Sequence, residues 1–183
     1  MLDYTPQNII EFWYSDEVRP MWFKSTALFD QQLRSRFELL CYRAAQSDLN
    51  DWKLSAEGCL ALAIILDQFP LNMYRGKPES FATESNAISV ARHAVRLGFD
   101  KQIPKEQVAF LYMPFMHSES IQDQNMSVQL FEAVGLADNL KFAMHHRDLI
   151  RRFGRFPHRN SILKRQSTAE EIDYLNSGAA FLG

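Results

Sequence analysis

Apolar residues recur three and four positions apart along almost the whole of this 183-residue chain. This spacing places apolar side chains on one side of an α-helix, whereas a half-buried strand would alternate apolar and polar residues. Two of the clearest stripes are Phe29-Leu33-Phe37-Leu40-Ala44 and Ala87-Ile88-Ala91-Val95. No segment shows a convincing strand pattern. The sequence therefore predicts an all-α protein with about eight helices, most of them joined by short loops.

Several helix starts can be assigned from N-cap residues. Thr5 comes directly before Pro6, an arrangement of N-cap and first helical residue that is typical of helix starts. Ser55 opens a helix that is apolar nearly all round, which indicates a central position in the fold. Thr168 and Glu171 have the spacing of a capping box, which predicts a short final helix.

Glycine and proline indicate where other helices end. A glycine follows each of three apolar stripes, those of the helices beginning near 84, 119 and 138, and predicts a C-terminal cap: Gly98, Gly135 and Gly154. Pro114 is expected to kink or end its helix near Met113, because the proline ring clashes with the carbonyl four residues earlier. Two longer loops are expected, at residues 69–83 and 154–167.

Length and composition are those of one globular domain over residues 1–183. The chain is 46% hydrophobic and 13% aromatic, which allows a sizeable core and excludes intrinsic disorder. The N-terminal segment turns polar at once, unlike a signal peptide. The longest apolar run is far shorter than the ~20 residues that span a bilayer. We therefore expect no membrane partner. Cys41 and Cys59 lie in apolar helical surroundings, which favours a reducing compartment, so we expect a cytoplasmic protein.

Charge is concentrated in one segment of the chain. Residues 141–165 carry eight of the 20 basic side chains and one acid, so this segment has a net charge of +7 while the remainder has −9. Such a segment favours an anionic partner, or else it neutralises acidic neighbours across the fold. Phe153 and Phe156 alternate with arginines, as in proteins that stack on single-stranded nucleic acid. A sequence pI near 6.2 makes nucleic acid the less favoured partner.

Polar side chains interrupt the apolar face of three predicted helices, at Asp67, Asp123 and His146. A buried carboxylate costs several kcal/mol unless it is paired or hydrogen-bonded, so each acid requires a partner. We expect residues 154–160 to fold back toward the start of the helix at 119–134 and to supply one for Asp123. Taken singly, each of these residues fits a structural role better than a functional one.

Taken together, polar residues from three parts of the chain have the composition of an active or ligand-binding site. If the three parts converge, they form an internal pocket. The candidates for proton transfer are His117, His146 and His158. The candidates for holding an anion are Arg75, Arg152, Arg155, Arg159 and Asn160. The candidates for orienting these groups are Asp67, Gln68, Asn72, Glu119 and Asp123. No spacing requires a metal, and no motif indicates a cofactor, so none is predicted.

Several blocks of the sequence resemble a known protein family. They are LDQFP at 66–70, FLYMPF at 110–115 and, most distinctively, RFGRFPHRN at 152–160. Over essentially its whole length the chain is similar to an uncharacterised, mainly bacterial family catalogued as domain of unknown function 924. The resemblance implies antiparallel helical hairpins in a tetratricopeptide-repeat-like arrangement, and it implies no activity. The chain departs from the family at Leu71, where a basic residue is usual, and at Glu84, Ser85 and Lys164.

Two hypotheses of function follow. The first is a pocket lined by Arg, His and Asp that binds a small anionic ligand, with catalysis left open. The alternative is a scaffold of helical repeats that binds a peptide or protein, in which the polar cluster is purely structural. A single solvent-connected cavity would favour the first, whereas pairs satisfied separately between helices would favour the second. The first also predicts that Arg155→Ala or His158→Ala leaves the melting temperature nearly unchanged or raised, while Asp67→Ala clearly lowers it.

Overall fold

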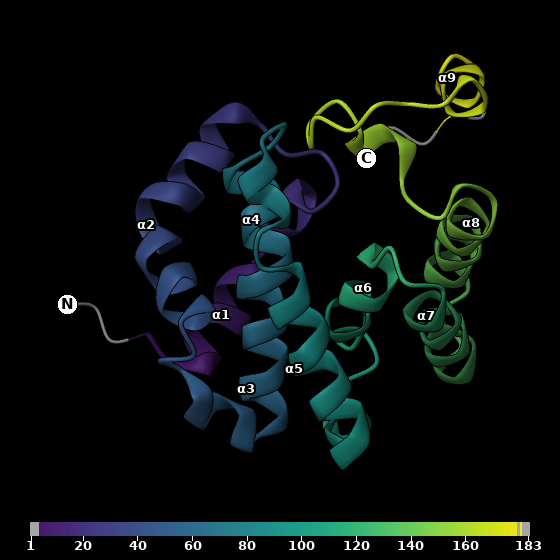
Figure 1. Ribbon diagram of the computed structural model, residues 1–183. Helices are drawn as coiled ribbons and strands as arrows, with labels where there is room; N and C mark the ends of the chain where they lie inside the picture. The colour runs from purple at the N-terminus through teal and green to yellow at the C-terminus, as the bar shows by residue number, and fades with distance from the viewer. Residues whose placement is uncertain (1–3, 179, 181–183) are drawn as a thin grey trace. The chain divides into compact units, whose positions relative to one another are not determined.

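The computed structural model describes residues 4–178 and 180, and within them it contains α-helices, short 3-10 segments and a π-helical turn but no strand (Figure 1). The α-helices are α1 (Pro6–Trp13), α2 (Ala27–Ala45), α3 (Ala56–Ala63), α4 (Phe69–Met73), α5 (Glu84–Leu97), α6 (Ala109–His117), α7 (Ile121–Val134), α8 (Ala137–Phe153) and α9 (Ala169–Leu175). A π-helical turn at Ile64–Gln68 joins α3 to α4 without a break, so the described residues form eight helical rods. The predicted all-α class and number of helices are confirmed. The tetratricopeptide-like arrangement stays a prediction.

The helix caps are those that the sequence predicts. Gly98, Gly135 and Gly154 end α5, α7 and α8 with φ angles of 70°, 71° and 73°. Glycine adopts this left-handed conformation without the steric cost that a Cβ imposes. Thr5 and Thr168 accept hydrogen bonds from the first turns of α1 and α9, and both form capping boxes.

Two element boundaries differ from the prediction. Of the two outcomes predicted for Pro114, a kink or an end near Met113, the end is wrong, because α6 continues through Pro114 to His117. Residues 110–116 are all buried, and burial of this apolar segment outweighs the hydrogen bond that the proline removes. The predicted loop at 69–83 is helical at its start, because α4 occupies Phe69–Met73.

The π-helical turn explains how the helix passes Pro70. The N–H of Phe69 donates to the carbonyl of Ile64, five residues earlier. Pro70 has no N–H to offer the carbonyl of Leu66, and the Thr83 hydroxyl donates to that carbonyl instead, at 2.6 Å. A side chain from a later part of the chain therefore replaces the lost helical hydrogen bond.

The described residues divide into two compact units. The first comprises residues 4–75 and 79–114, and the second comprises residues 76–78, 115–178 and 180. The boundary in the later part of the chain falls within α6, after Pro114. The prediction of a single domain over residues 1–183 is not tested by this division and stays a prediction.

Aromatic rings fill the core of the first unit. Ring centroids are 4.9 Å apart for Phe37 and Phe69, 5.6 Å for Trp13 and Phe69, and 5.5 Å for Trp13 and Phe110. Tilted and edge-on contacts of this kind add to the stabilisation from burial. Helix α3 packs against both α1 and α5, so the helix that is apolar nearly all round is central to this unit.

The second unit is built on the hairpin of α7 and α8, which lie side by side (Figure 1). Only Gly135 and Leu136 separate the two helices, and so short a connection makes them antiparallel. The end of α8 packs on α9 through an apolar cluster: Leu149, Ile150, Phe156 and Tyr174. The loop between α8 and α9, residues 154–168, carries several of the predicted site residues.

Candidate functional site

In the second unit, three predicted histidines gather near Phe156. The ring centroid of Phe156 is 5.4 Å from that of His146 and 5.6 Å from that of His158. The rings of His117 and His146 are 6.5 Å apart, and the guanidinium carbon of Arg159 lies 4.7 Å from the Phe156 centroid. His117, His146 and His158, here called the histidine cluster, come from α6, α8 and the loop after α8. Folding therefore unites residues from two of the three predicted parts.

Charged groups of both signs surround the histidine cluster, and Arg159, Arg165 and Glu119 all act on His158. His146 is buried, and desolvation, followed by the nearby His117, lowers its pKa to about 3. Burial and then Arg159 lower the pKa of half-buried His158 to about 4, against a smaller opposing effect of Glu119. Both imidazoles are therefore neutral at neutral pH.

Two side chains hold the end of α6, where His117 lies. The Nε2 of Gln124 donates to the carbonyls of Met116 and Ser118, each at 2.7 Å. The Nη2 of Arg159 donates to the carbonyl of His117, also at 2.7 Å. The last carbonyls of a helix have no partner within the helix, so these side chains both satisfy them and fix the backbone around His117.

Glu119 ties the loop after α8 to the start of α7. Its Oε1 accepts a hydrogen bond from the N–H of Phe156 at 2.8 Å, and Arg165 donates to both carboxylate oxygens at 2.7 and 2.9 Å. Burial raises the pKa of Glu119, but the hydrogen bonds from Arg165 and Phe156 outweigh it and hold the pKa below its ordinary value. The predicted fold-back of this loop is confirmed, with Glu119 as its anchor. Asp123, for which a loop donor was expected, accepts from the Ser118 hydroxyl at 2.9 Å.

A second carboxylate, Glu171, is 2% exposed. It accepts hydrogen bonds from Arg155 Nε and Nη2 at 2.7 and 2.9 Å, from Asn160 Nδ2 at 3.2 Å and from the N–H of Thr168 at 2.8 Å. These bonds, that from Arg155 first, lower the pKa of Glu171 to about 2. The Nε of Arg165 donates to Asn160 Oδ1 at 3.0 Å, which links this network to Glu119.

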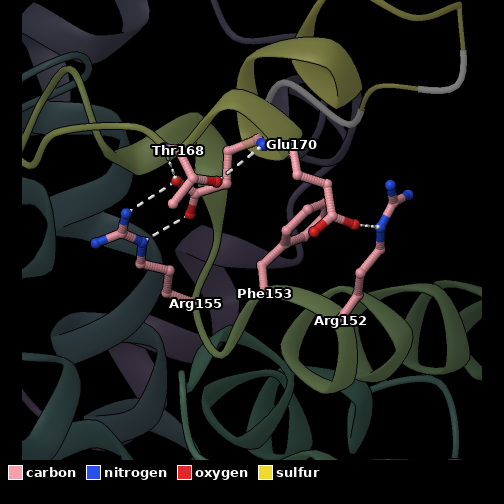
Figure 2. A pocket seen from close by; sticks show the side chains of 6 residues that line it. Arg152, Phe153, Arg155, Thr168 and Glu170 are labelled. Carbon is pink, nitrogen blue, oxygen red and sulfur yellow. Dashed lines mark hydrogen bonds and ion pairs between the residues drawn. The ribbon is translucent and has the colours of Figure 1, made fainter.

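A cavity of about 320 Å³ opens between α8 and α9 (Figure 2). Its lining comprises Arg152, Phe153, Arg155, Thr168, Glu170 and Glu171. Arg152 donates to Glu170 at 2.8 Å, so the two arginines of the cavity each face a carboxylate, as Figure 2 shows. Arg152 and Arg155 therefore line a cavity, but their charges are balanced within it. Pairs of this kind fit the structural alternative.

The remaining predicted residues lie in the first unit. Asp67 and Gln68 belong to the π-helical turn, where the Gln68 amide donates to the Asp67 carboxylate. Arg75 donates to Asn72 at 2.7 Å and to Asp30 at 3.0 Å. The convergence of this group with the histidine cluster stays a prediction.

Basic side chains of residues 141–165 form ion pairs with acids, as the neutralising interpretation predicts. Lys141 lies 3.2 Å from Asp138, and Arg151 lies 3.7 Å from Asp148. Arg152, Arg155 and Arg165 contact carboxylates as described above. The guanidinium of Arg159 also donates to the backbone carbonyl of His117, within the histidine cluster.

Three residues of this site are not among those that the sequence predicts. Nothing in the sequence distinguishes Arg165 from the other basic residues of its segment, because its role depends on Glu119, which is 46 residues away in the chain. The sequence pattern around Glu171 indicates only a helix cap. Gln124 lies seven residues before Phe131 on the buried face of α7, and this helical spacing is a signal that could have identified it.

Neither a metal centre nor a membrane span is found in the described part of the chain. No group of three His, Cys, Asp or Glu side chains among residues 4–178 and 180 could hold a metal ion. No helix among those residues is long and apolar enough to cross a membrane.

Comparison with known proteins places the chain in a family. A family model described as a bacterial protein of unknown function, DUF924, matches residues 9–179. The chain belongs to the DUF924 family. This DUF924 chain is similar to the solved structure of the protein of unknown function ATU0120 from Agrobacterium tumefaciens, with 39% identity and a TM-score of 0.89 over 94% of this chain and 97% of that chain. No curated protein matches. The resemblance seen in the sequence is confirmed, and DUF924 membership brings no activity.

Proposed function

We propose that the histidine cluster and Arg159 bind a small anionic molecule. The observation that carries this proposal is the gathering of three imidazoles from separate elements beside a buried guanidinium. Guanidinium groups are strong donors to the oxygens of carboxylates and phosphates, and imidazoles donate or accept according to their tautomer. His117 and His158 keep part of their surface exposed, which gives a ligand access.

The pairs Arg155–Glu171 and Arg165–Glu119, here called the frame together with Asn160, support the loop that carries His158. Arg155 and Asn160 are bonded to Glu171, and Arg165 is bonded to Glu119, so these groups hold the loop that carries His158. A binding site needs such support to keep its side chains in a productive geometry. We therefore assign Arg155 and Asn160 to the frame, although the sequence placed them among the ligand-binding residues.

The same cluster could move protons to or from a bound molecule. A neutral imidazole nitrogen can accept a proton, and His146 and His158 are neutral at neutral pH, although their lowered pKa values make them weak bases there. Proton transfer by His117, His146 or His158 is thus an extension of the binding proposal.

A second candidate function, contact with a protein partner, is favoured by α2. Leu28, Leu39 and Tyr42 are 64%, 61% and 61% exposed. Their spacing of 11 and 14 residues places them on one face of the helix. Exposed apolar faces are typical of protein–protein contacts.

The proposed setting is the cytoplasm. Cys41 and Cys59 are free and buried. Burial raises the pKa of Cys59 to about 11, so this thiol is protonated and unreactive at neutral pH. Buried free thiols fit a reducing compartment.

Thermal unfolding with inorganic phosphate tests the binding proposal. Because a ligand that binds only the folded state stabilises it by mass action, we expect the wild-type melting temperature to rise with phosphate concentration at constant ionic strength. His158→Asn should largely abolish the rise. The control is His93→Asn, at a half-buried histidine of the first unit, which should keep it. An absent rise in the wild type, or an equal rise in both variants, would overturn the proposal.

A further inference from the structure

One line of residues on the solvent-facing side of α2 is uncharged along the whole helix. Its members follow one another at alternating intervals of four and three residues, so they share one face of the helix. All of them are exposed: Leu28, Gln32, Ser35, Leu39, Tyr42 and Gln46. An exposed helix face ordinarily carries charged residues, whereas the centre of a protein–protein interface is depleted of them. This line of residues, here called the α2 seam, has the composition of an interface centre.

The charged residues that directly flank the α2 seam lie on opposite sides according to their sign. Glu38 lies on one flank, and Arg36 and Arg43 lie on the other. The Oε1 of Glu38 accepts hydrogen bonds from the Tyr74 hydroxyl at 2.8 Å and from Arg34 Nε at 3.0 Å. These bonds, that from Tyr74 first, lower the pKa of Glu38, so the carboxylate is ionised at neutral pH. An uncharged centre with a charged rim is the usual anatomy of an interface.

A second copy of the same helix complements this arrangement. Alternating intervals of four and three give a repeat of 3.5 residues, which keeps the seams of two supercoiled helices in contact. In a parallel pair related by a two-fold axis, each seam residue meets its own counterpart. Glu38 of each copy then lies opposite Arg43 of the other, at the flanking positions where paired helices form salt bridges.

The reverse direction of pairing is unfavourable. Antiparallel helices would bring the flanks that carry Arg36 and Arg43 together, and each Glu38 would face the acidic flank of the other copy. Like charges placed together at an interface are repulsive. The charges beside the α2 seam therefore favour the parallel pair.

We propose, resting on the second candidate function, that two copies of this chain associate through a parallel pair of α2 helices. Leu28, Leu39 and Tyr42 supply the apolar contacts, and two Glu38–Arg43 pairs determine the direction of pairing. The polar members of the α2 seam fix the alignment of the two helices at a cost in affinity. The dimer is therefore weak, and its fraction depends on protein concentration.

Sedimentation velocity of the full-length protein, from about 10 µM to about 1 mM, tests the proposal. We expect the dimer fraction to rise with concentration. Leu39→Glu places like charges in the α2 seam and should abolish the dimer, whereas Leu97→Glu, at an exposed residue of α5, should leave it unchanged. A wild type that stays monomeric would overturn the proposal and leave contact between α2 and a different protein standing. Equal dimer fractions for the two variants would also overturn it, because the dimer would then form on another face.

Charge reversal tests the pairing of the flanks. Glu38→Arg and Arg43→Glu should each weaken the dimer at least about fivefold, because each creates two pairs of like charges. The double variant restores opposite charges and should recover most of the affinity. Circular dichroism verifies that each variant is folded. A double variant weaker than both single variants would contradict the parallel register.

Cross-linking tests the direction independently. Leu28→Cys should form a disulfide-linked dimer with oxidised glutathione, because parallel pairing sets the two introduced thiols side by side. The native Cys41 and Cys59 are buried and give no such product. Leu97→Cys is the control and should remain monomeric. If Leu28→Cys forms no more dimer than this control, the parallel pair is refuted.

Discussion

Glu171 stays ionised in an almost closed environment because four hydrogen bonds reach its two carboxylate oxygens. As the third residue of α9 it also completes a capping box with Thr168. One side chain therefore stabilises the start of a helix and anchors the preceding loop through Arg155 and Asn160. Removing one partner of such a group leaves a buried charge without compensation.

At this scale we predict that Arg155→Ala lowers the melting temperature by several degrees, because Glu171 loses its bidentate partner. This reverses the expectation drawn from the sequence. Arg151→Ala is the matched control on α8: Arg151 and Asp148 are 53% and 66% exposed, and an exposed pair contributes little. Thermal unfolding followed by circular dichroism measures both variants. Equal melting temperatures for the two would contradict the role given to Arg155.

At the scale of the element, the rod from α3 to α4 shows how a helix can contain a proline. In the π-helical turn an N–H donates to the carbonyl five residues earlier instead of four. The Thr83 hydroxyl donates to the Leu66 carbonyl, because Pro70 has no N–H that could do so. The rod carries Asp67, Gln68 and Asn72 from the predicted site. The position of these side chains thus depends on a contact from outside the rod.

We therefore predict that Thr83→Val, nearly the same in shape, destabilises the protein by about 1–2 kcal/mol, because it leaves the Leu66 carbonyl without its donor. Thr83→Ser keeps the hydroxyl and should stay close to the wild type. Unfolding in urea, analysed with a common slope, gives the two free energies. Should Val and Ser prove equally stable, the hydroxyl is not what supports the turn.

For the whole molecule, the question is whether the two compact units unfold together. The three tryptophans, Trp13, Trp22 and Trp52, all belong to the first unit, so their fluorescence follows that unit alone. The far-ultraviolet circular dichroism signal follows the helices of both units. If residues 1–183 form one domain, as the sequence predicts, the two probes should give coincident urea transitions. Separate midpoints would show two domains and refute that prediction.

The sequence by itself determined the helices, most of their ends and the family. Those features depend on neighbouring residues: the apolar period, the N-cap threonines, and glycines such as Gly154, whose φ of 73° a side chain would resist. The same local rules failed at two prolines. At Pro70 the Thr83 hydroxyl replaces the helical hydrogen bond that proline cannot form, and at Pro114 the packing of buried apolar residues outweighs the tendency of proline to end a helix.

Only the tertiary structure decided which partner each polar side chain takes. Arg155 had the composition of an anion ligand, yet it is bonded to Glu171, and Arg165 reaches Glu119 across 46 residues of chain. Such pairings, and the desolvation that keeps His146 neutral, depend on distances that no local pattern encodes. The sequence supplied the charged groups, and the fold determined which of them neutralise one another.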